Sequence, residues 1–334
     1  MATRIGICTR YDRHDGAYVA TIFADWLAAN CFFVSMYAVP CRKQRVCQGV
    51  HWDADAHDGN KVLFSDWVTT VDIVVWIVQP QPEQVAYLIQ HKIKSYVVYD
   101  FYDVVVGSTL EMFKHADYII AINRACAVKC ANWSKIRKPV FLPLAPTTPL
   151  YQKQGLFDHR RVTVLWPIFD GDWMRYGKIV EAHMAKVLRE YNGTFFLNIV
   201  VSSADIPTHM LRTLQIWRKR YPETVRLITC RDIAWRDMHY QTADVLFWPT
   251  RVENAMLRGL QAYAYGMPII GFMASPVNEL LAANPNLAVP VAEKDKDSAG
   301  YIVDDPHKLY VELMDKLVSV VHTPALLVEA SANA

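Results

Sequence analysis

The sequence predicts an α/β protein of two domains, each with a parallel sheet covered by helices. Two observations predict this class. Apolar runs of strand length alternate with segments of helical periodicity, and this alternation breaks at residues 145–149 and then restarts. The chain of 334 residues is also long enough for two domains of ordinary size. We therefore expect domains at 1–145 and 160–322, joined by a linker at 145–160.

The composition is that of a folded protein, with 52% hydrophobic and 20% charged residues. A formal net charge of +2 argues neither for nor against a polyanionic partner. The 7 cysteines are odd in number and form no CxxC pair, so we expect reduced thiols, no zinc site and a cytoplasmic protein. We expect no leader segment and no membrane span, because no apolar run is long enough.

In the first half, the sequence predicts six strands separated by helices. The expected strands are 4–9, 32–38, 71–78, 96–99, 118–122 and 140–144. The expected helices are 17–30, 83–91, 111–115 and 123–133. Residues 40–60 are polar and irregular, and we expect a loop there. A glycine, Gly16, lies in the loop between the first strand and the first helix, which is typical of a nucleotide-binding sheet but also of a simple turn.

The second half repeats the rhythm. The expected strands are 162–167, 194–201, 225–229 and 243–248, followed by one that begins at Ile269. A loop at 168–178 leads into a helix that ends near 191, and further helices are expected at 210–220, 235–241 and 307–321. This order again requires a parallel sheet with helices on both faces.

The most informative stretch is 248–272. A strand is followed by a turn at 249–252, and the pattern predicts a helix that starts at Glu253 and is stopped by Gly266 and Pro268. A helix N-terminus suits phosphate, and Gln261 lies two turns after Glu253 on about the same face. The alternative is that Glu253 only complements the helix dipole.

This stretch resembles the signature of retaining glycosyltransferases of the GT-B fold, glycosyltransferase family 4. Those proteins carry a Glu, seven residues, a second Glu and then Ala-x-Ala-x-Gly-x-Pro. Here the run is Glu253, seven residues, Gln261 and then residues 262–268 in that pattern. Residues 232–244, which end in an Ala-Asp pair, are similar to the family as well. Gln261 departs from the second Glu, so it offers hydrogen bonds but no charge.

The resemblance implies two Rossmann-like domains that face each other across a cleft, with a late helix crossing back to the first domain. It also implies a nucleotide-sugar donor held by the second domain, with Glu253 as a catalytic residue. The donor-binding residues that it implies are Gly16, Arg175, Lys178, Arg251, Asn254, Ala255, Gln261, Asp232 and Ile233. The family's Gly-Arg at the start of the loop that holds Arg175 is missing here.

Asp100 ends a strand of the first domain, where the acceptor is expected. An Asp there is a candidate base for the acceptor hydroxyl, and such a base is typical of inverting enzymes, whereas the Glu253 signature indicates retention. The alternative is that Asp100 only caps the next segment. Asp170-Gly-Asp172 is similar to metal-binding Asp-x-Asp motifs, but GT-B enzymes generally work without a metal, so we expect no metal and no cofactor.

The predicted function is therefore a nucleotide-sugar-dependent hexosyl- or pentosyltransferase that acts on an acceptor hydroxyl, with retention favoured. The acceptor is open, and a modified base in phage DNA fits as well as a small metabolite does. Two alternatives remain. One is an inactive GT-B-like protein that binds sugar nucleotides, which Gln261 and the missing Gly-Arg support; the other is an epimerase of the same fold.

Overall fold

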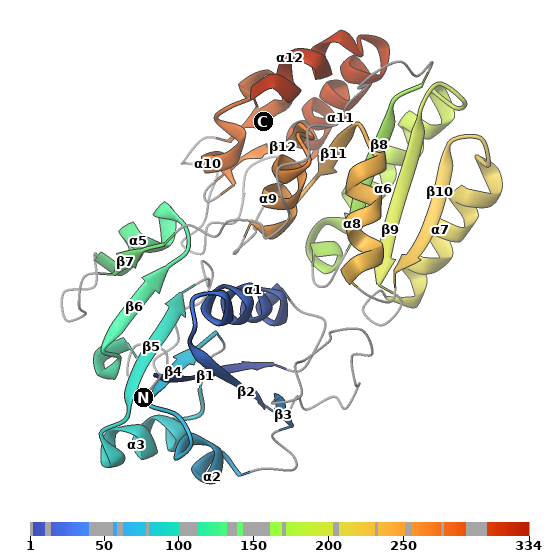
Figure 1. Ribbon diagram of the computed structural model, residues 1–334. Helices are drawn as coiled ribbons and strands as arrows, with labels where there is room; N and C mark the ends of the chain where they lie inside the picture. The colour runs from blue at the N-terminus through green and yellow to red at the C-terminus, as the bar shows by residue number, and fades with distance from the viewer. Residues whose placement is uncertain are drawn as a thin grey trace. The chain divides into compact units, whose positions relative to one another are not determined.

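A computed structural model describes residues 3–10, 15–39, 56–58, 63–77, 80–99, 113–131, 139–142, 161–168, 172–202, 207–230, 233–250, 256–274, 277–291 and 306–333. The chain divides into two compact units, Met1–Thr147 and Thr148–Ala334 (Figure 1). The predicted domain limits at 145 and 160 lie in a segment outside the described residues.

The first unit contains a seven-stranded parallel sheet in the order β3-β2-β1-β4-β5-β6-β7. Its strands are β1 (Arg4–Arg10), β2 (Phe33–Val39), β3 (Ala56–Asp58), β4 (Ile73–Trp76), β5 (Lys94–Tyr99), β6 (Tyr118–Ala121) and β7 (Val140–Phe141). The prediction of a loop throughout 40–60 is wrong at β3, which pairs with β2 at the edge of the sheet. This strand of three residues, Ala-His-Asp, has no apolar alternation that could reveal it.

The helices of the first unit are α1 (Asp15–Ala29), α2 (Phe64–Val68), α3 (Pro82–His91) and α5 (Arg124–Ala131). The sequence did not predict α2, which is a single short turn of helix. Its Trp67 is nonetheless among the most buried side chains of the described residues and donates from Nε1 to Ser35 Oγ over 3.0 Å. An apolar cluster that includes Trp67, Trp76 and Phe113 forms one part of the core.

The second unit contains a six-stranded parallel sheet in the order β10-β9-β8-β11-β12-β13. Its strands are β8 (Thr163–Ile168), β9 (Phe196–Ser202), β10 (Val225–Cys230), β11 (Val245–Trp248), β12 (Ile269–Met273) and β13 (Ala288–Pro290). Counted within the unit, this is the order 3-2-1-4-5-6 of dinucleotide-binding sheets, and the first unit begins with the same order.

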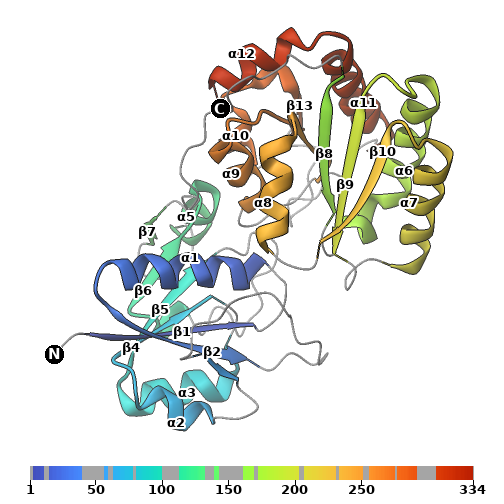
Figure 2. The same ribbon diagram turned by 45° about the vertical axis from the view of Figure 1, so that its right-hand side comes forward.

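Helices cover both faces of the second sheet, as Figure 2 shows for α8 on one face and α6 and α7 on the other. The helical elements are α6 (Asp172–Glu190), α7 (Thr208–Arg220), α8 (Ile233–Thr242), α9 (Leu257–Ala264), α10 (Asn278–Leu281), η1 (Pro285–Leu287), α11 (Pro306–His322) and α12 (Ala325–Asn333). Alternate residues of β9 enter separate cores, since Ile199 packs with α6, α7 and α11 while Val200 packs with α8 and α9. This is the two-sided burial that a parallel sheet requires.

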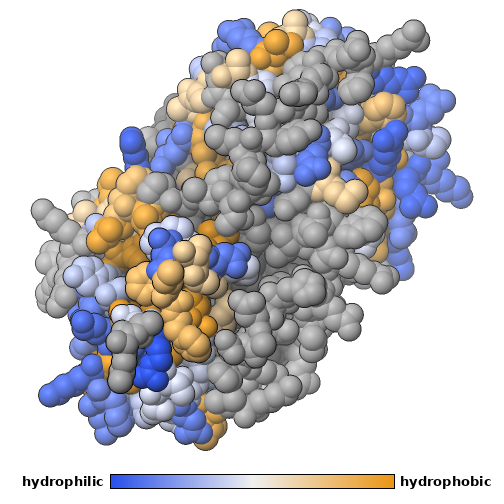
Figure 3. All heavy atoms as spheres, viewed as in Figure 1, coloured by the Kyte–Doolittle hydropathy of each residue, from blue (hydrophilic) through white to orange (hydrophobic). Residues whose placement is uncertain are grey.

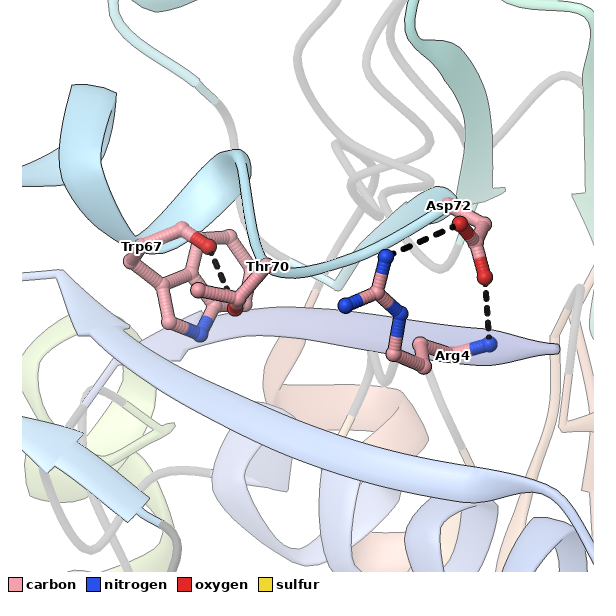
Figure 4. Close-up of polar contacts among 4 residues, drawn as sticks. All are labelled: Arg4, Trp67, Thr70 and Asp72. Carbon is pink, nitrogen blue, oxygen red and sulfur yellow. Dashed lines mark hydrogen bonds and ion pairs between the residues drawn. The ribbon is translucent and has the colours of Figure 1, made fainter. Parts of the chain in front are cut away.

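An aspartate directly before a strand ties that strand to its parallel neighbour. Asp72 precedes β4, and its Oδ2 accepts from the backbone N–H of Arg4, at the start of β1, over 2.8 Å (Figure 4). The Asp72 N–H donates to the Arg4 carbonyl over 2.8 Å, and the Arg4 guanidinium lies 3.4 Å from Asp72 Oδ1. The hydrogen bond from the Arg4 backbone, followed by that from its side chain, lowers the pKa of the Asp72 carboxyl.

The same reciprocal pair, in which the aspartate carboxylate accepts one hydrogen bond and the aspartate N–H donates the other, occurs twice more. Asp117, before β6, joins Ser95 at the start of β5, and Asp244, before β11, joins Thr163 at the start of β8. Each aspartate therefore fixes the relative register of two adjacent parallel strands at their amino ends. The Ala-Asp pair at 243–244 is thus explained by sheet assembly.

Candidate active site

Topology singles out one edge of the second sheet. Strand order reverses between β8 and β11, which lie side by side with Val164 opposite Val245. Ligands of open α/β sheets bind beyond the carboxyl ends of the strands at such a reversal. The segments that leave this point are 169–171, which leads into α6, and 249–256, which leads into α9.

The segment after β8 differs from the prediction. Arg175 and Lys178 were expected in a loop, but α6 begins at Asp172, so both residues lie in its first two turns. The glycine at 177, which the prediction placed in that loop, is buried inside the helix. Lys178 is exposed. Two cationic residues thus follow the carboxyl end of β8 on the N-terminal turns of a helix, a setting that favours anions.

The segment after β11 is fixed at its start. The Tyr310 hydroxyl, on α11, donates to the Pro249 carbonyl over 3.0 Å in a buried hydrogen bond. The Tyr310 ring also meets Phe272 of β12 edge-on, with centroids 5.0 Å apart. α11 therefore positions the first residue of the segment that carries Glu253.

The helix that follows begins later than the sequence predicts. Glu253 was expected to start it, but α9 begins at Leu257, and its N-cap Met256 has a left-handed backbone with φ of 55°. A right-handed helix cannot continue back through that conformation. Leu260 N donates to the Met256 carbonyl over 2.9 Å, and the Met256 side chain makes no capping hydrogen bond. The first amides of α9 thus have no cap from the N-cap residue.

Close packing holds α9 against the sheet. A Cβ on Gly259 would lie 2.6 Å from Cζ3 of Trp248, the last residue of β11, and 2.5 Å from Cδ1 of Leu280. Only glycine allows this approach. The helix ends as predicted, since Gly266 has a φ of 62° and its N–H donates to the Tyr263 carbonyl over 2.9 Å.

Two polar side chains of α9 are almost fully buried. Arg258 is 3% exposed and Gln261, three residues later, is 1% exposed. Residues at this spacing lie on neighbouring parts of one helix face. A buried guanidinium is stable only beside acceptors or an anion, so α9 brings a positive charge into its first turn.

Comparison with known proteins supplies the fold. No family model and no curated protein sequence matches the chain. Among solved structures, it is similar to sucrose-phosphate synthase from Thermosynechococcus elongatus, with a TM-score of 0.64 and 13% identity over 99% of this chain and 92% of that one. It is also similar to an alpha-glucosyltransferase in complex with UDP-glucose and DNA containing an abasic site, with a TM-score of 0.60 and 10% identity over 100% of this chain and 94% of that one. The chain is similar as well to HepE from Anabaena in complex with UDP and glucose, with a TM-score of 0.62 and 10% identity over 99% of this chain and 94% of that one.

The chain has the GT-B fold. The predicted fold class, two Rossmann-like α/β domains, is confirmed. At 10–13% identity the three comparisons show the fold alone. Residue roles must therefore be argued from this chain.

Several predicted site residues of this GT-B chain lie outside the described residues. They are Asp100, Asp232, Arg251, Glu253, Asn254 and Ala255. Two others are placed by the backbone. Ile233 is the first residue of α8, after β10, and Gly16 lies in the first turn of α1 rather than in the loop before it, because that helix begins at Asp15.

Sequence reasoning did not find Tyr310. It lies 61 residues from Pro249, and a Tyr in an amphipathic helix resembles any other core residue. The described residues contain no group of three or more His, Cys, Asp or Glu that could hold a metal ion. None of the described helices has the length and apolarity needed to cross a membrane.

Proposed function

We propose that the chain is a glycosyltransferase that moves a sugar from a nucleotide-diphosphate donor to an acceptor hydroxyl, with retention at the anomeric carbon. One observation carries the proposal. The run from Glu253 to Gln261 follows β11 and enters α9 at the strand reversal of a GT-B donor-type unit. Solved structures that are similar to the whole chain include glycosyltransferases.

The reaction breaks the bond between C1 of the sugar and the donor phosphate oxygen, so negative charge grows on the leaving diphosphate. Cations and amides that face this oxygen lower the barrier. We assign this role to Arg175, Lys178 and Arg251 and to the amides of Asn254 and Ala255. The N-terminus of α9, which lacks a cap from Met256, supports a phosphate nearby.

The sugar and the base of the donor need other partners. We assign Glu253 to the sugar as the catalytic carboxylate, Gln261 to the ribose, Asp232 and Ile233 to the base and Gly16 to the phosphates from the first unit. The acceptor oxygen bonds C1, and its proton passes to a basic oxygen of the departing diphosphate or of Asp100. Retention requires the acceptor to attack from the face that the diphosphate leaves.

The neighbours guide the choice of substrates. The alpha-glucosyltransferase is in complex with UDP-glucose and DNA, and HepE is in complex with UDP and glucose. We therefore propose a UDP-hexose as the donor and a hydroxylated base in DNA as the acceptor. Such a base must leave the duplex stack to reach the donor.

A panel of nucleotide sugars tests the donor. A ligand present at 100 times its Kd stabilises the folded chain by about 2.7 kcal/mol, which appears as a raised melting temperature. We expect protection by a UDP-sugar and release of UDP when hydroxymethylated duplex DNA is added. No protection by any nucleotide sugar would refute the proposal.

Substitution of Glu253 tests the mechanism. Glu253→Gln is expected to keep the donor protection and to lower kcat by about 100-fold or more, because a positioned charge of this kind typically contributes that much. Glu190→Gln, on the exposed end of α6, is the matched control and should leave kcat unchanged. Full activity of Glu253→Gln would remove Glu253 from the mechanism.

The same panel separates the second candidate. Gln261 stands where the family has a carboxylate, which favours a sugar-nucleotide-binding protein without turnover. That protein would be protected by a UDP-sugar and would release no UDP with any acceptor. An epimerase would convert the donor in the absence of an acceptor.

A further inference from the structure

A groove runs along the outer edge of the second sheet, between α7 and the edge strand β10. Its volume is about 450 Å³, and the residues that line it include the apolar Leu211 and Leu227 and the polar Arg218, Lys219 and Thr229. We call it the α7 groove. Within the described sheet β10 pairs only with β9, so one row of its backbone N–H and C=O groups faces away from the sheet.

The cations at this groove are not neutralised by their neighbours. Arg218, Lys219 and Arg220 form the last turn of α7 and all three are exposed. None of them makes an ion pair with any residue in the described ranges. The turn that follows contributes one acid, Glu223. The edge therefore keeps most of its positive charge.

Aromatic rings support the neighbouring guanidinium groups. The Arg220 guanidinium carbon lies 5.6 Å from the centre of the Tyr221 ring. Arg226 alternates along β10 with the groove residues Leu227 and Thr229, so it lies on the other face of the strand, where its guanidinium carbon is 4.3 Å from the centre of the Phe196 ring, which Arg161 approaches to 5.5 Å. A ring restricts a guanidinium but leaves its charge and most of its N–H groups available to a phosphate.

The charges at the groove lie along the last turn of α7, rather than around one enclosed point. A small anion is usually bound in a pocket where donors converge, whereas a nucleic-acid backbone presents a row of phosphates, one charge per about 1.7 Å of duplex axis. We propose that the α7 groove, with the exposed cations in the last turn of α7, binds the phosphodiester backbone of DNA. The proposal deepens the proposed acceptor and rests on it.

The groove extends along β10. Val201 and Thr229 lie near the carboxyl ends of β9 and β10, the edge that carries the site after β11, whereas Arg218 and Lys219 belong to the last turn of α7, which leads into the amino end of β10. β10 is three strands away from β11, which at about 4.8 Å per strand is roughly 15 Å, and the cations lie farther still because they are toward the other end of β10. A duplex held by these cations would therefore contact the groove more than about four base pairs from the target base.

Charges beside an edge strand also discourage pairing with other chains. DNA binding and protection of the edge strand predict different effects of salt on the affinity for DNA. Each phosphate contact adds about 0.9 to the slope of log K against log salt and strengthens binding about 8-fold at ~0.1 M salt. A purely protective charge contributes nothing to this slope.

The experiment measures binding of a fluorescent 20-base-pair duplex to the full chain by anisotropy, over a range of salt concentrations. We compare the wild type with Arg218→Ala/Lys219→Ala and with Lys186→Ala/Arg189→Ala, a double variant that removes two exposed cations from α6. The first variant is expected to lose about 2 from the slope and tens of fold in affinity at ~0.1 M salt, while the control keeps the wild-type slope. Circular dichroism and UDP-glucose protection should match the wild type in both.

An unchanged slope in Arg218→Ala/Lys219→Ala, an equal loss in the control, or a wild type that does not bind the duplex would each overturn the inference. The proposed function fails separately. If the chain binds DNA through the groove but no UDP-sugar protects it, the DNA-binding inference is supported and the proposed transferase activity is refuted. If a UDP-sugar protects the chain but its DNA binding does not depend on Arg218 and Lys219, the transferase proposal stands and the DNA-binding inference is refuted.

Discussion

Gly259→Ala is expected to push α9 away from the sheet and to weaken the donor site. The added Cβ would lie 2.5 Å from Leu280 Cδ1 and 2.6 Å from Trp248 Cζ3, about 1 Å closer than carbon atoms normally approach. The Trp248 ring is 1% exposed and has no room to move, so the helix must shift. Overpacking of this kind costs about 1–3 kcal/mol, and replacing a helical glycine with alanine returns about 1 kcal/mol.

We therefore expect Gly259→Ala to lower the free energy of unfolding by about 1 kcal/mol, and up to about 2. Urea unfolding of the full chain, followed by tryptophan fluorescence, measures this loss. Leu280→Ala removes one of the two clashes, so the double variant should be more stable than the sum of the single effects by about 0.5 kcal/mol or more. The shifted helix should also raise KM for the donor several-fold. A Gly259→Ala chain that unfolds at the same urea concentration as the wild type, or at a higher one, would refute this packing argument.

Two further predictions concern α11 and its neighbours. Tyr310→Phe leaves the buried Pro249 carbonyl without its donor, so we expect a loss of about 1–3 kcal/mol by urea unfolding and a higher KM for the donor; an unchanged KM would show that this bond does not position the site. Burial first, and then the charges of His307 and Lys186, lower the pKa of His183, so the folded chain binds this proton less readily than the unfolded chain does. The stability from neutral His183 is therefore complete above about pH 6.5 and is lost as the pH falls towards the lower folded pKa. His183→Gln should make the fall in melting temperature between pH 7.5 and pH 5.5 smaller, and an equal fall in both chains would contradict this assignment.

Much of the fold could be predicted because burial on both faces of a parallel sheet leaves a direct trace in the sequence. β11 reads Val-Leu-Phe-Trp and is buried throughout, and β12 begins at the predicted Ile269. The end of α9 was equally clear, since Gly266 takes up a left-handed conformation that most residues avoid.

The start of the same helix could not be predicted, because nothing in local propensity marks Met256 as left-handed. Methionine is a good helix former and lies on the apolar face that the periodicity predicts, and it is indeed buried. The tertiary structure overrides that preference. For the same reason the contact between Tyr310 and Pro249 was beyond sequence reasoning, since it depends on how α11 packs on the sheet.

The Ala-Asp pairs separate what is structural in the sequence from what is functional. Asp244 ties β11 to β8, the two strands whose carboxyl ends carry the candidate site, so the resemblance that included this pair identified a real constraint on the site. Asp117 makes the same two bonds between β5 and β6 of the first unit, where the sequence Ala-Asp also precedes the strand. The pair therefore serves strand pairing in both units and carries no information about the donor. Among the sequence motifs, the mechanistic argument rests on the run from Glu253 to Gln261, which is why the Glu253→Gln experiment tests the mechanism.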